Sequence, residues 1–128
     1  MLENGIKGRA EASVTPENTA EKMGSGDCPV FATPSMVALM EAAACRSVAP
    51  YLSEGETTVG VSLNIRHSAA TTIGKTVRAE SELIQVDGRK LIFQVTAFDE
   101  AGEIGGGEHA RAIVNREKFL ARAAQRGQ

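Results

Sequence analysis

The sequence is poor in the residues that build metal clusters and disulfide frameworks, with two cysteines and two histidines among 128 residues. Cys28 and Cys45 lack metal-ligand spacing and have no paired histidine–cysteine cluster around them, so neither a metal nor a cofactor is expected. Two thiols allow one disulfide at most, and reduced cysteines in a cytosolic chain are the simpler expectation.

Long apolar runs and an excess of positive charge are also missing. No stretch approaches the roughly 18 apolar residues that a membrane-spanning helix needs, and the N-terminus lacks the apolar segment of a signal peptide. The formal net charge is −2, and no basic stripe carries interleaved aromatics, which argues against a nucleic-acid surface. These absences predict a cytoplasmic protein whose partners include neither a membrane nor a nucleic acid.

The composition that remains is that of an ordinary globular protein. Hydrophobic residues make up 42% of the chain and charged residues 23%, which argues against disorder. A chain of 128 residues suits one hydrophobic core, so we expect a single domain over residues 1–128.

The first half of the chain predicts one strand and one long apolar helix. Residues 6–14 alternate weakly and suggest a short strand, whereas residues 15–29 are polar and read as a loop. Strong helix formers then continue to Val48, with Thr33 as the expected N-cap and Pro34 in the first helical position. This helix has almost no polar face, so we expect it to be buried on nearly all sides.

The second half predicts a set of antiparallel strands. Period-two alternation and turn signals place them at residues 59–65, 75–86, 89–98 and 103–115. Asp87-Gly88 is a strong hairpin signal, and residues 116–125 form a short amphipathic helix. The expected fold is therefore α+β: a five-stranded antiparallel sheet wrapped around one long buried helix, which is the hotdog arrangement. An open sheet edge favours pairing with a second copy, so we expect a homodimer, with a dimer of dimers as the larger alternative.

Glu41 is the most informative candidate for chemistry. It is the only charged residue between Asp27 and Arg46. Its helical neighbours, none of which can pair with it, are Val37, Ala38, Ala44 and Cys45. Such isolation predicts a desolvated carboxylate, the usual condition of a general base or nucleophile. The alternative is a surface glutamate on a narrow exposed strip of the helix.

Thr33 and His67 are further candidates, each with a structural alternative. Thr33 is either a simple N-cap or a hydroxyl placed where a helix N-terminus favours negative charge, and the two roles are compatible. His67 closes the first strand after the helix and is either a surface residue or a site residue. The other histidine, His109, alternates to the same face as Arg111, so these two side chains are predicted to line one wall.

The ordered motifs resemble a known family. The segments that carry the resemblance are Val30-Phe-Ala-Thr33, Met36-Val, Leu39-Met-Glu41, Ala49-Pro-Tyr-Leu52, Gly60, His67-Ser-Ala-Ala with Gly74, Asp87-Gly88-Arg89, Glu103-Ile-Gly-Gly-Gly-Glu-His-Ala-Arg111-Ala and Glu117-Lys-Phe119. Together they resemble the fluoroacetyl-CoA thioesterase family of hotdog enzymes from about residue 28 onward. The resemblance implies hydrolysis of short acyl-CoA thioesters at a site on the dimer interface.

The resemblance also implies roles for five residues. The catalytic threonine, glutamate and histidine of the family fall on Thr33, Glu41 and His67, and its active-site glycine and arginine fall on Gly60 and Arg111. In the fluoroacetate-detoxifying members, an aromatic residue shortly before the Phe-Ala-Thr segment closes a lid over the acyl group. The corresponding stretch here, residues 24–29, contains no aromatic residue, so a broader short-chain acyl-CoA thioesterase is expected.

Two other functions fit a hotdog fold. An enoyl-CoA hydratase would use an acid–histidine pair, but hydratases usually place both groups on or beside the helix, whereas His67 lies far downstream on a strand. A non-catalytic acyl-CoA-binding regulator would be expected to carry a DNA-binding segment, which is not recognised in this sequence. We therefore expect an acyl-CoA thioesterase that needs no cofactor.

Overall fold

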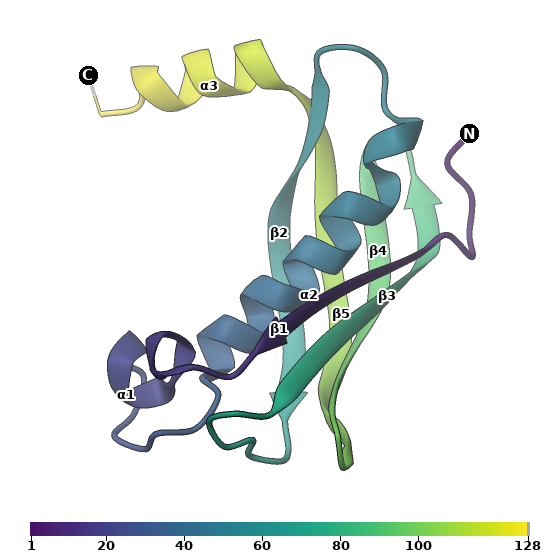
Figure 1. Ribbon diagram of the computed structural model, residues 1–128. Coiled ribbons are helices and arrows are strands. Elements are labelled where there is room, and N and C mark those ends of the chain that lie inside the picture. The colour runs from purple at the N-terminus through teal and green to yellow at the C-terminus, as the bar shows by residue number, and fades with distance from the viewer. Residues whose placement is uncertain (128) are drawn as a thin grey trace.

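The computed structural model describes residues 1–127 and contains three helices and five strands of regular structure in that range (Figure 1). In chain order these are β1 (Lys7–Ser13), α1 (Ala20–Met23), α2 (Thr33–Val48), β2 (Glu56–His67), β3 (Thr76–Asp87), β4 (Lys90–Asp99), β5 (Gly102–Asn115) and α3 (Arg116–Gln125). Single turns of 3-10 helix precede α1 and follow α2, at Pro16–Asn18 and Ala49–Tyr51.

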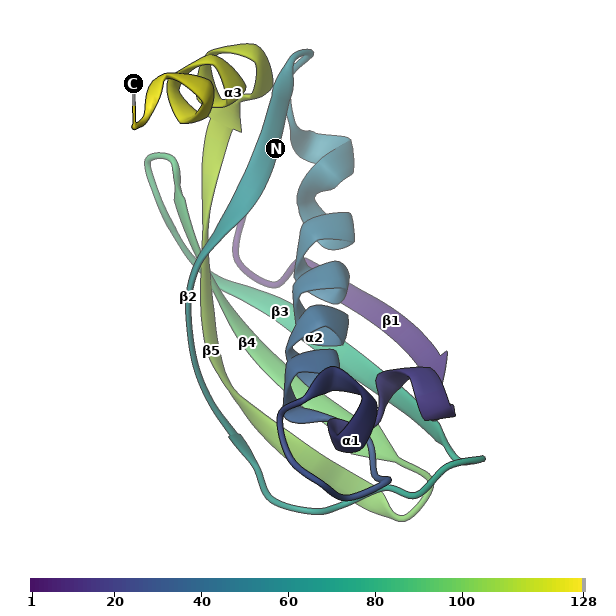
Figure 2. The same ribbon diagram turned by 90° about the vertical axis from the view of Figure 1, so that its left-hand side faces the viewer.

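The five strands form one antiparallel sheet in the order β1-β3-β4-β5-β2. The sheet curls, and α2 lies along its concave side (Figures 1 and 2). Short turns dictate the order of the last strands, because Asp87-Gly88 reverses the chain between β3 and β4 with Gly88 at φ +61°. The predicted α+β architecture is therefore confirmed, including the short C-terminal helix.

The predicted loop at residues 15–29 contains more structure than expected. Thr15 and Asn18 form a reciprocal capping box around the 3-10 turn. The hydroxyl of Thr19 then accepts a hydrogen bond from the backbone N–H of Lys22 and caps α1. Short polar side chains that signal a loop also cap short helical turns, and here capping prevails.

The core lies between α2 and the sheet. The helix turns its buried side chains toward the strands, and these are Met36, Met40, Ala43, Ala44 and Val48. Leu83, Leu91, Phe93 and Val95 of β3 and β4 pack in the same cluster and are fully buried. Gly8 lets the helix approach β1 closely, because a Cβ there would collide with the carbonyl oxygen of Ala43.

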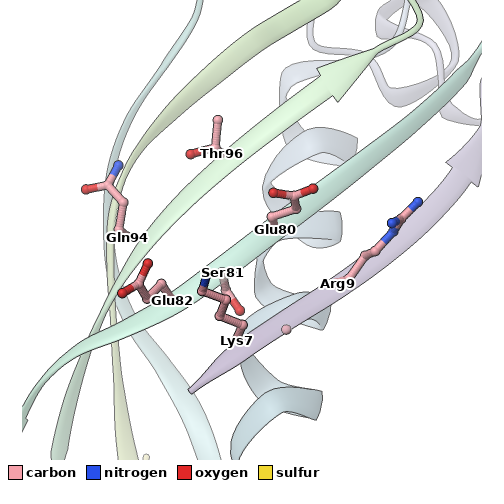
Figure 3. Close-up of a pocket in the computed structure, with 8 residues that line it drawn as sticks. Lys7, Arg9, Glu80, Ser81, Glu82, Gln94 and Thr96 are labelled. Atoms are coloured by element: carbon pink, nitrogen blue, oxygen red, sulfur yellow. The ribbon is translucent and has the colours of Figure 1, made fainter. Parts of the chain in front are cut away.

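The opposite face of the sheet is polar. Figure 3 shows a shallow pocket on this face, where labelled side chains of β1, β3 and β4 such as Arg9, Glu80 and Thr96 point away from α2, whereas Ser81 is buried on the helix side. Its lining includes Lys7, Arg9, Glu80 and Glu82, whose charges of both signs offset each other. None of the predicted site residues lies there, so the candidate site is on the helix side.

One side of α2 remains open in the single chain. Val37, Glu41 and Cys45 are half-buried there, and Ala38 is exposed. Burial on nearly all sides is thus not achieved within one chain, because β2 lies at the end of the curled sheet and leaves this side uncovered. None of the described helices is long and apolar enough to cross a membrane.

Candidate functional site

The first part of the site is a side-chain pair at the start of α2. Thr33 Oγ1 lies 2.7 Å from Nδ1 of His67, which is the last residue of β2. The predicted N-cap role of Thr33 is wrong: the N-cap is Ala32, and no side chain caps this end of α2. The hydroxyl is thereby free to face the histidine, and the helix N-terminus keeps backbone N–H groups without a side-chain acceptor.

His67 is poised in its neutral form. Burial lowers its pKa, while a polar contact with the backbone of Ala69 opposes part of that effect. Its Nε2 is buried and has no hydrogen-bonding partner within residues 1–127. A neutral imidazole with one nitrogen on a hydroxyl and the other uncommitted is suited to proton transfer near neutral pH.

A cleft of about 290 Å³ opens beside this pair. Thr33 and His67 line it together with small side chains from several segments, namely Ala20, Ser25, Ala69 and Ala70. Val30, Phe31 and Ser68 complete the lining. The pair therefore borders a concavity, the usual form of a small-molecule site.

The second part of the site surrounds Glu41, in the middle of α2. Its Oε2 lies 3.4 Å from Nη1 of Arg111, which projects from β5. The predicted isolation of Glu41 is wrong, because its counter-charge comes from a strand 70 residues away in sequence. The carboxylate keeps 38% of its side-chain surface exposed, so it is accessible to a ligand on the open side of α2.

Gly60 provides the space for this carboxylate. A Cβ at Gly60 would collide with Oε2 of Glu41 and would lie 3.6 Å from Nη1 of Arg111. The pairing between β2 and β5 also shifts register between Gly60 and Ser62, so the strand bulges at this point. Gly60 therefore allows the carboxylate of Glu41 to approach the backbone of β2 closely.

Arg111 is held by two residues that the sequence reasoning did not assign to the site. Its Nε donates to Oγ1 of Thr58 at 2.9 Å, and its Nη2 donates to the Thr58 carbonyl at 3.0 Å. Its Nη1 also lies 3.2 Å from Nε2 of His109, and the guanidinium is almost fully buried. The strand alternation that places His109 on the same face as Arg111 indicates that His109 belongs to the site. No sequence pattern indicates the same for Thr58.

The structure thus brings the five predicted residues into two groups. Thr33 and His67 form one group, and Glu41, Gly60 and Arg111 form the other. Eight residues of α2 separate Thr33 from Glu41, which is about 12 Å along a helix axis. Each group alone supplies part of a hydrolytic site: the first a hydroxyl and a base, the second a carboxylate beside a fixed cation.

The glycine run of β5 shapes the strand next to His67. A Cβ at Gly105 would collide with the carbonyl oxygen of Arg66, and one at Gly107 would collide with that of Asn64. These glycines therefore allow the backbones of β5 and β2 to approach closely. Within residues 1–127 there is no cluster of three or more metal-ligating side chains, and Cys28 and Cys45 are both free.

The sequence is similar to a known protein family and to a characterised member of it. The family model described as fluoroacetyl-CoA-specific thioesterase matches residues 14–117. The fluoroacetyl-CoA thioesterase of Streptantibioticus cattleyicolor is 47% identical over 97 residues, covering 76% of this chain and 70% of that protein.

Solved structures agree in fold. One is the fluoroacetyl-CoA thioesterase FlK with a threonine-to-serine substitution, in complex with acetyl-CoA. It aligns with a TM-score of 0.93 and 37% identity over 99% of this chain and 100% of that chain. A hot-dog-like protein from Thermanaerovibrio acidaminovorans shares the fold at a TM-score of 0.89 and 20% identity, over 99% and 94% of the two chains. The family match spans most of the chain and the solved relatives share its whole fold, so this protein belongs to the fluoroacetyl-CoA-specific thioesterase family.

Proposed function

We propose that this protein hydrolyses short-chain acyl-CoA thioesters to the free acid and CoA. The observation that carries the proposal is the 2.7 Å contact between Thr33 Oγ1 and His67 Nδ1 in the lining of the cleft. Membership of a thioesterase family supports the same reaction. Hydrolysis adds water across the C–S bond and changes no oxidation state, so it needs no redox cofactor, and we propose that the side chains act without a metal.

Each of the three candidate catalytic residues has a role in this reaction. The nucleophile is either water or a side-chain oxygen of Glu41 or Thr33; it attacks the acyl carbon, the C–S bond breaks, and the CoA sulfur leaves with a proton. An acyl-enzyme formed on a side chain is then hydrolysed by water to the free acid. Glu41 acts as the base or the nucleophile, and His67 orients the reacting groups or supplies the proton. Thr33 places its hydroxyl near the carbonyl, where the uncapped N-terminus of α2 favours developing negative charge.

Gly60 and Arg111 support the carboxylate. Gly60 leaves room for Glu41, and Arg111 holds it at 3.4 Å. Because Arg111 has only 7% of its side chain exposed, its charge is little screened by water and acts strongly on nearby polar groups of a substrate.

We further propose a broad preference for short acyl groups in place of selectivity for fluoroacetyl. The cleft is walled mainly by small side chains, among them Ala20, Ser25 and Ala69. Residues 24–29 contain no aromatic side chain that would close over an acyl group. Two structures of the relative FlK, one solved with acetyl-CoA and one with fluoroacetate, support acyl groups of this size.

The complete site in this proposal belongs to a cytoplasmic homodimer formed along β2. This strand ends the sheet, is 12 residues long and exposes 60% of Val61. The opposite edge strand, β1, is shorter and carries the outward charges Lys7, Arg9 and Glu11, which discourage edge pairing. A second copy at β2 would cover the open side of α2 and bring the two groups of site residues together across the interface.

A thiol-release assay over acetyl-, fluoroacetyl-, propionyl- and butyryl-CoA tests the proposal. We expect release from several of these thioesters, and loss of it in Glu41→Ala and His67→Ala. Glu54→Ala is the matched control, because Glu54 is exposed in the turn before β2. Circular dichroism of each variant checks whether the fold is retained.

The other outcomes identify the rival functions. Normal turnover by Glu41→Ala and His67→Ala would refute the site assignment. Hydration of crotonyl-CoA without thiol release would favour a hydratase, and acyl-CoA binding without either reaction would favour a non-catalytic binding protein.

A further inference from the structure

His109 is the most deeply buried titratable side chain that the proposed mechanism does not use. It is fully buried in β5, and its ring stacks on Phe93 of β4 at a centroid distance of 6.1 Å. On its other side it reaches β2 through the carbonyl of Ser62. A histidine enclosed in this way has no contact with solvent, so its hydrogen bonds must be satisfied by fixed neighbours.

The two neighbours of His109 dictate where its proton lies. Nδ1 is 2.9 Å from the Ser62 carbonyl oxygen, which only accepts, so Nδ1 must carry the hydrogen. Nε2 is 3.2 Å from Nη1 of Arg111, which only donates, so Nε2 must be the acceptor. One neutral tautomer fits both neighbours, and a second proton on Nε2 would point at the N–H groups of a cation.

With this tautomer, each nitrogen of the Arg111 guanidinium has a hydrogen-bond acceptor. Thr58 binds the guanidinium through Nε and Nη2, which leaves Nη1. That nitrogen faces only two acceptors within the described residues, Nε2 of His109 and Oε2 of Glu41. The imidazole therefore takes one hydrogen of Nη1 and directs the other toward the carboxylate.

We infer that His109 is a positioning residue: a permanently neutral imidazole that accepts a hydrogen bond from Arg111 and thereby aims this cation at Glu41. It touches no substrate and acts only through Arg111. Its effect on turnover rests on the proposed function of Glu41, whereas its tautomer does not. The charged groups that face the ring are Arg111 from β5 and Glu41 from α2.

The tautomer is tested by nitrogen NMR of the imidazole rings. The chain has only two histidines, so a His67→Ala sample identifies the His109 signals. We expect a protonated Nδ1 and an unprotonated Nε2 that stay unchanged from pH 7.5 to pH 6. A protonated Nε2, in either the other tautomer or an imidazolium, would overturn the inference even if the protein hydrolysed no thioester.

The positioning role is tested by two substitutions in the same assay. His109→Phe keeps a ring against Phe93 but removes the acceptor, and we expect kcat to fall on the order of tenfold to a hundredfold with KM nearly unchanged. His109→Gln places an amide oxygen near the former Nε2, so it should recover most of that loss. Both variants lose the hydrogen bond to Ser62, and this makes them a matched pair.

A purely structural role predicts a different result. In that case both variants would lose thermal stability alike, and kcat per folded molecule would stay at the wild-type value, which would overturn the positioning role. Absence of thiol release by the wild-type protein would instead refute the proposed function, and the NMR result would still decide the tautomer.

Discussion

The hydroxyl of Thr33 and the imidazole of His67 are hydrogen-bonded within one chain, with Oγ1 and Nδ1 2.7 Å apart across 34 residues of sequence. The pair exists because α2 begins beside the point where β2 ends. The helix N-cap is Ala32, so the hydroxyl has no capping duty and serves the histidine alone. Any catalytic use of one partner therefore involves the other.

Thr33→Val tests this pair, because it keeps the branched shape of the side chain and removes the hydroxyl. We expect thiol release to fall by about 100-fold or more, the range that a positioned proton-transfer group contributes. Stability should change by no more than about 0.5 kcal/mol, because Thr33 is exposed and caps nothing. Thr33→Ser should retain part of the activity, and Thr72→Val is the control at an exposed threonine outside the cleft lining. Turnover by Thr33→Val at the wild-type rate would show that the hydroxyl is dispensable.

Gly60→Ala tests the second group without removing any functional atom. The new Cβ would meet the end of the Glu41 side chain, which can swing away, and Gly60 has no positive φ that would strain an alanine. We therefore expect a folded protein that loses about 1 kcal/mol or less of its free energy of unfolding. Its turnover should nevertheless fall by about tenfold or more, because the displaced carboxylate leaves Arg111. Wild-type turnover in this variant would mean that the observed position of Glu41 is not the reactive one.

The fold was predictable because its signals are local. Apolar helix formers from Thr33 to Val48 and period-two alternation after the Glu54-Gly55-Glu56 turn place α2 and the strands within a few residues of their observed bounds. β2 begins at Glu56, earlier than the predicted residue 59. Its pairing with β5 extends to Asn115, so residues 56–58 join the strand although their sequence does not yet alternate clearly.

The site was predictable only in part, because its contacts are not local. Glu41 was singled out as an unpaired carboxylate, since only its helical neighbours are visible in sequence. Its partner Arg111 comes from the last strand, and the neighbours Thr58 and His109 follow only once β2 and β5 are paired. Pairing of strands that are distant in sequence depends on the packed sheet, so no single segment encodes it.

Mixing two inactive variants tests whether one site uses residues of two chains. If Thr33 and Glu41 of different chains form each site, a heterodimer of Thr33→Val and Glu41→Gln contains one intact site. Random re-association after dilution should then restore about a quarter of wild-type turnover, because about half of the dimers are heterodimers and each has one working site. Sedimentation of the mixture confirms that dimers are present. No recovery in such a mixture would place both residues of a site on the same chain.

The pH dependence of stability tests the neutral state of the two histidines. Burial lowers the pKa of His67 and is also the largest effect on the pKa of His109. For His109, the charge of Arg111 lowers the pKa further, whereas the hydrogen bond to Ser62 and the charge of Glu41 raise it in part. Below the ordinary value of 6.5, the unfolded chain therefore binds protons that the folded chain does not. The free energy of unfolding should fall as the pH drops from 7 to 5, by at most about 1.4 kcal/mol per pH unit for the buried His109.

Urea unfolding at several pH values measures this slope, and the His109→Gln protein should show a smaller one. Asp99 does not interfere in this window. Although burial opposes it, hydrogen bonds from Thr71 and from backbone N–H groups lower its pKa, so its contribution is lost only below the ordinary value of 3.8. A free energy of unfolding that stayed constant or rose between pH 7 and 5 would show that both histidines are protonated in the folded chain as readily as in the unfolded one. It would also remove the reason to treat His109 as a fixed acceptor for Arg111.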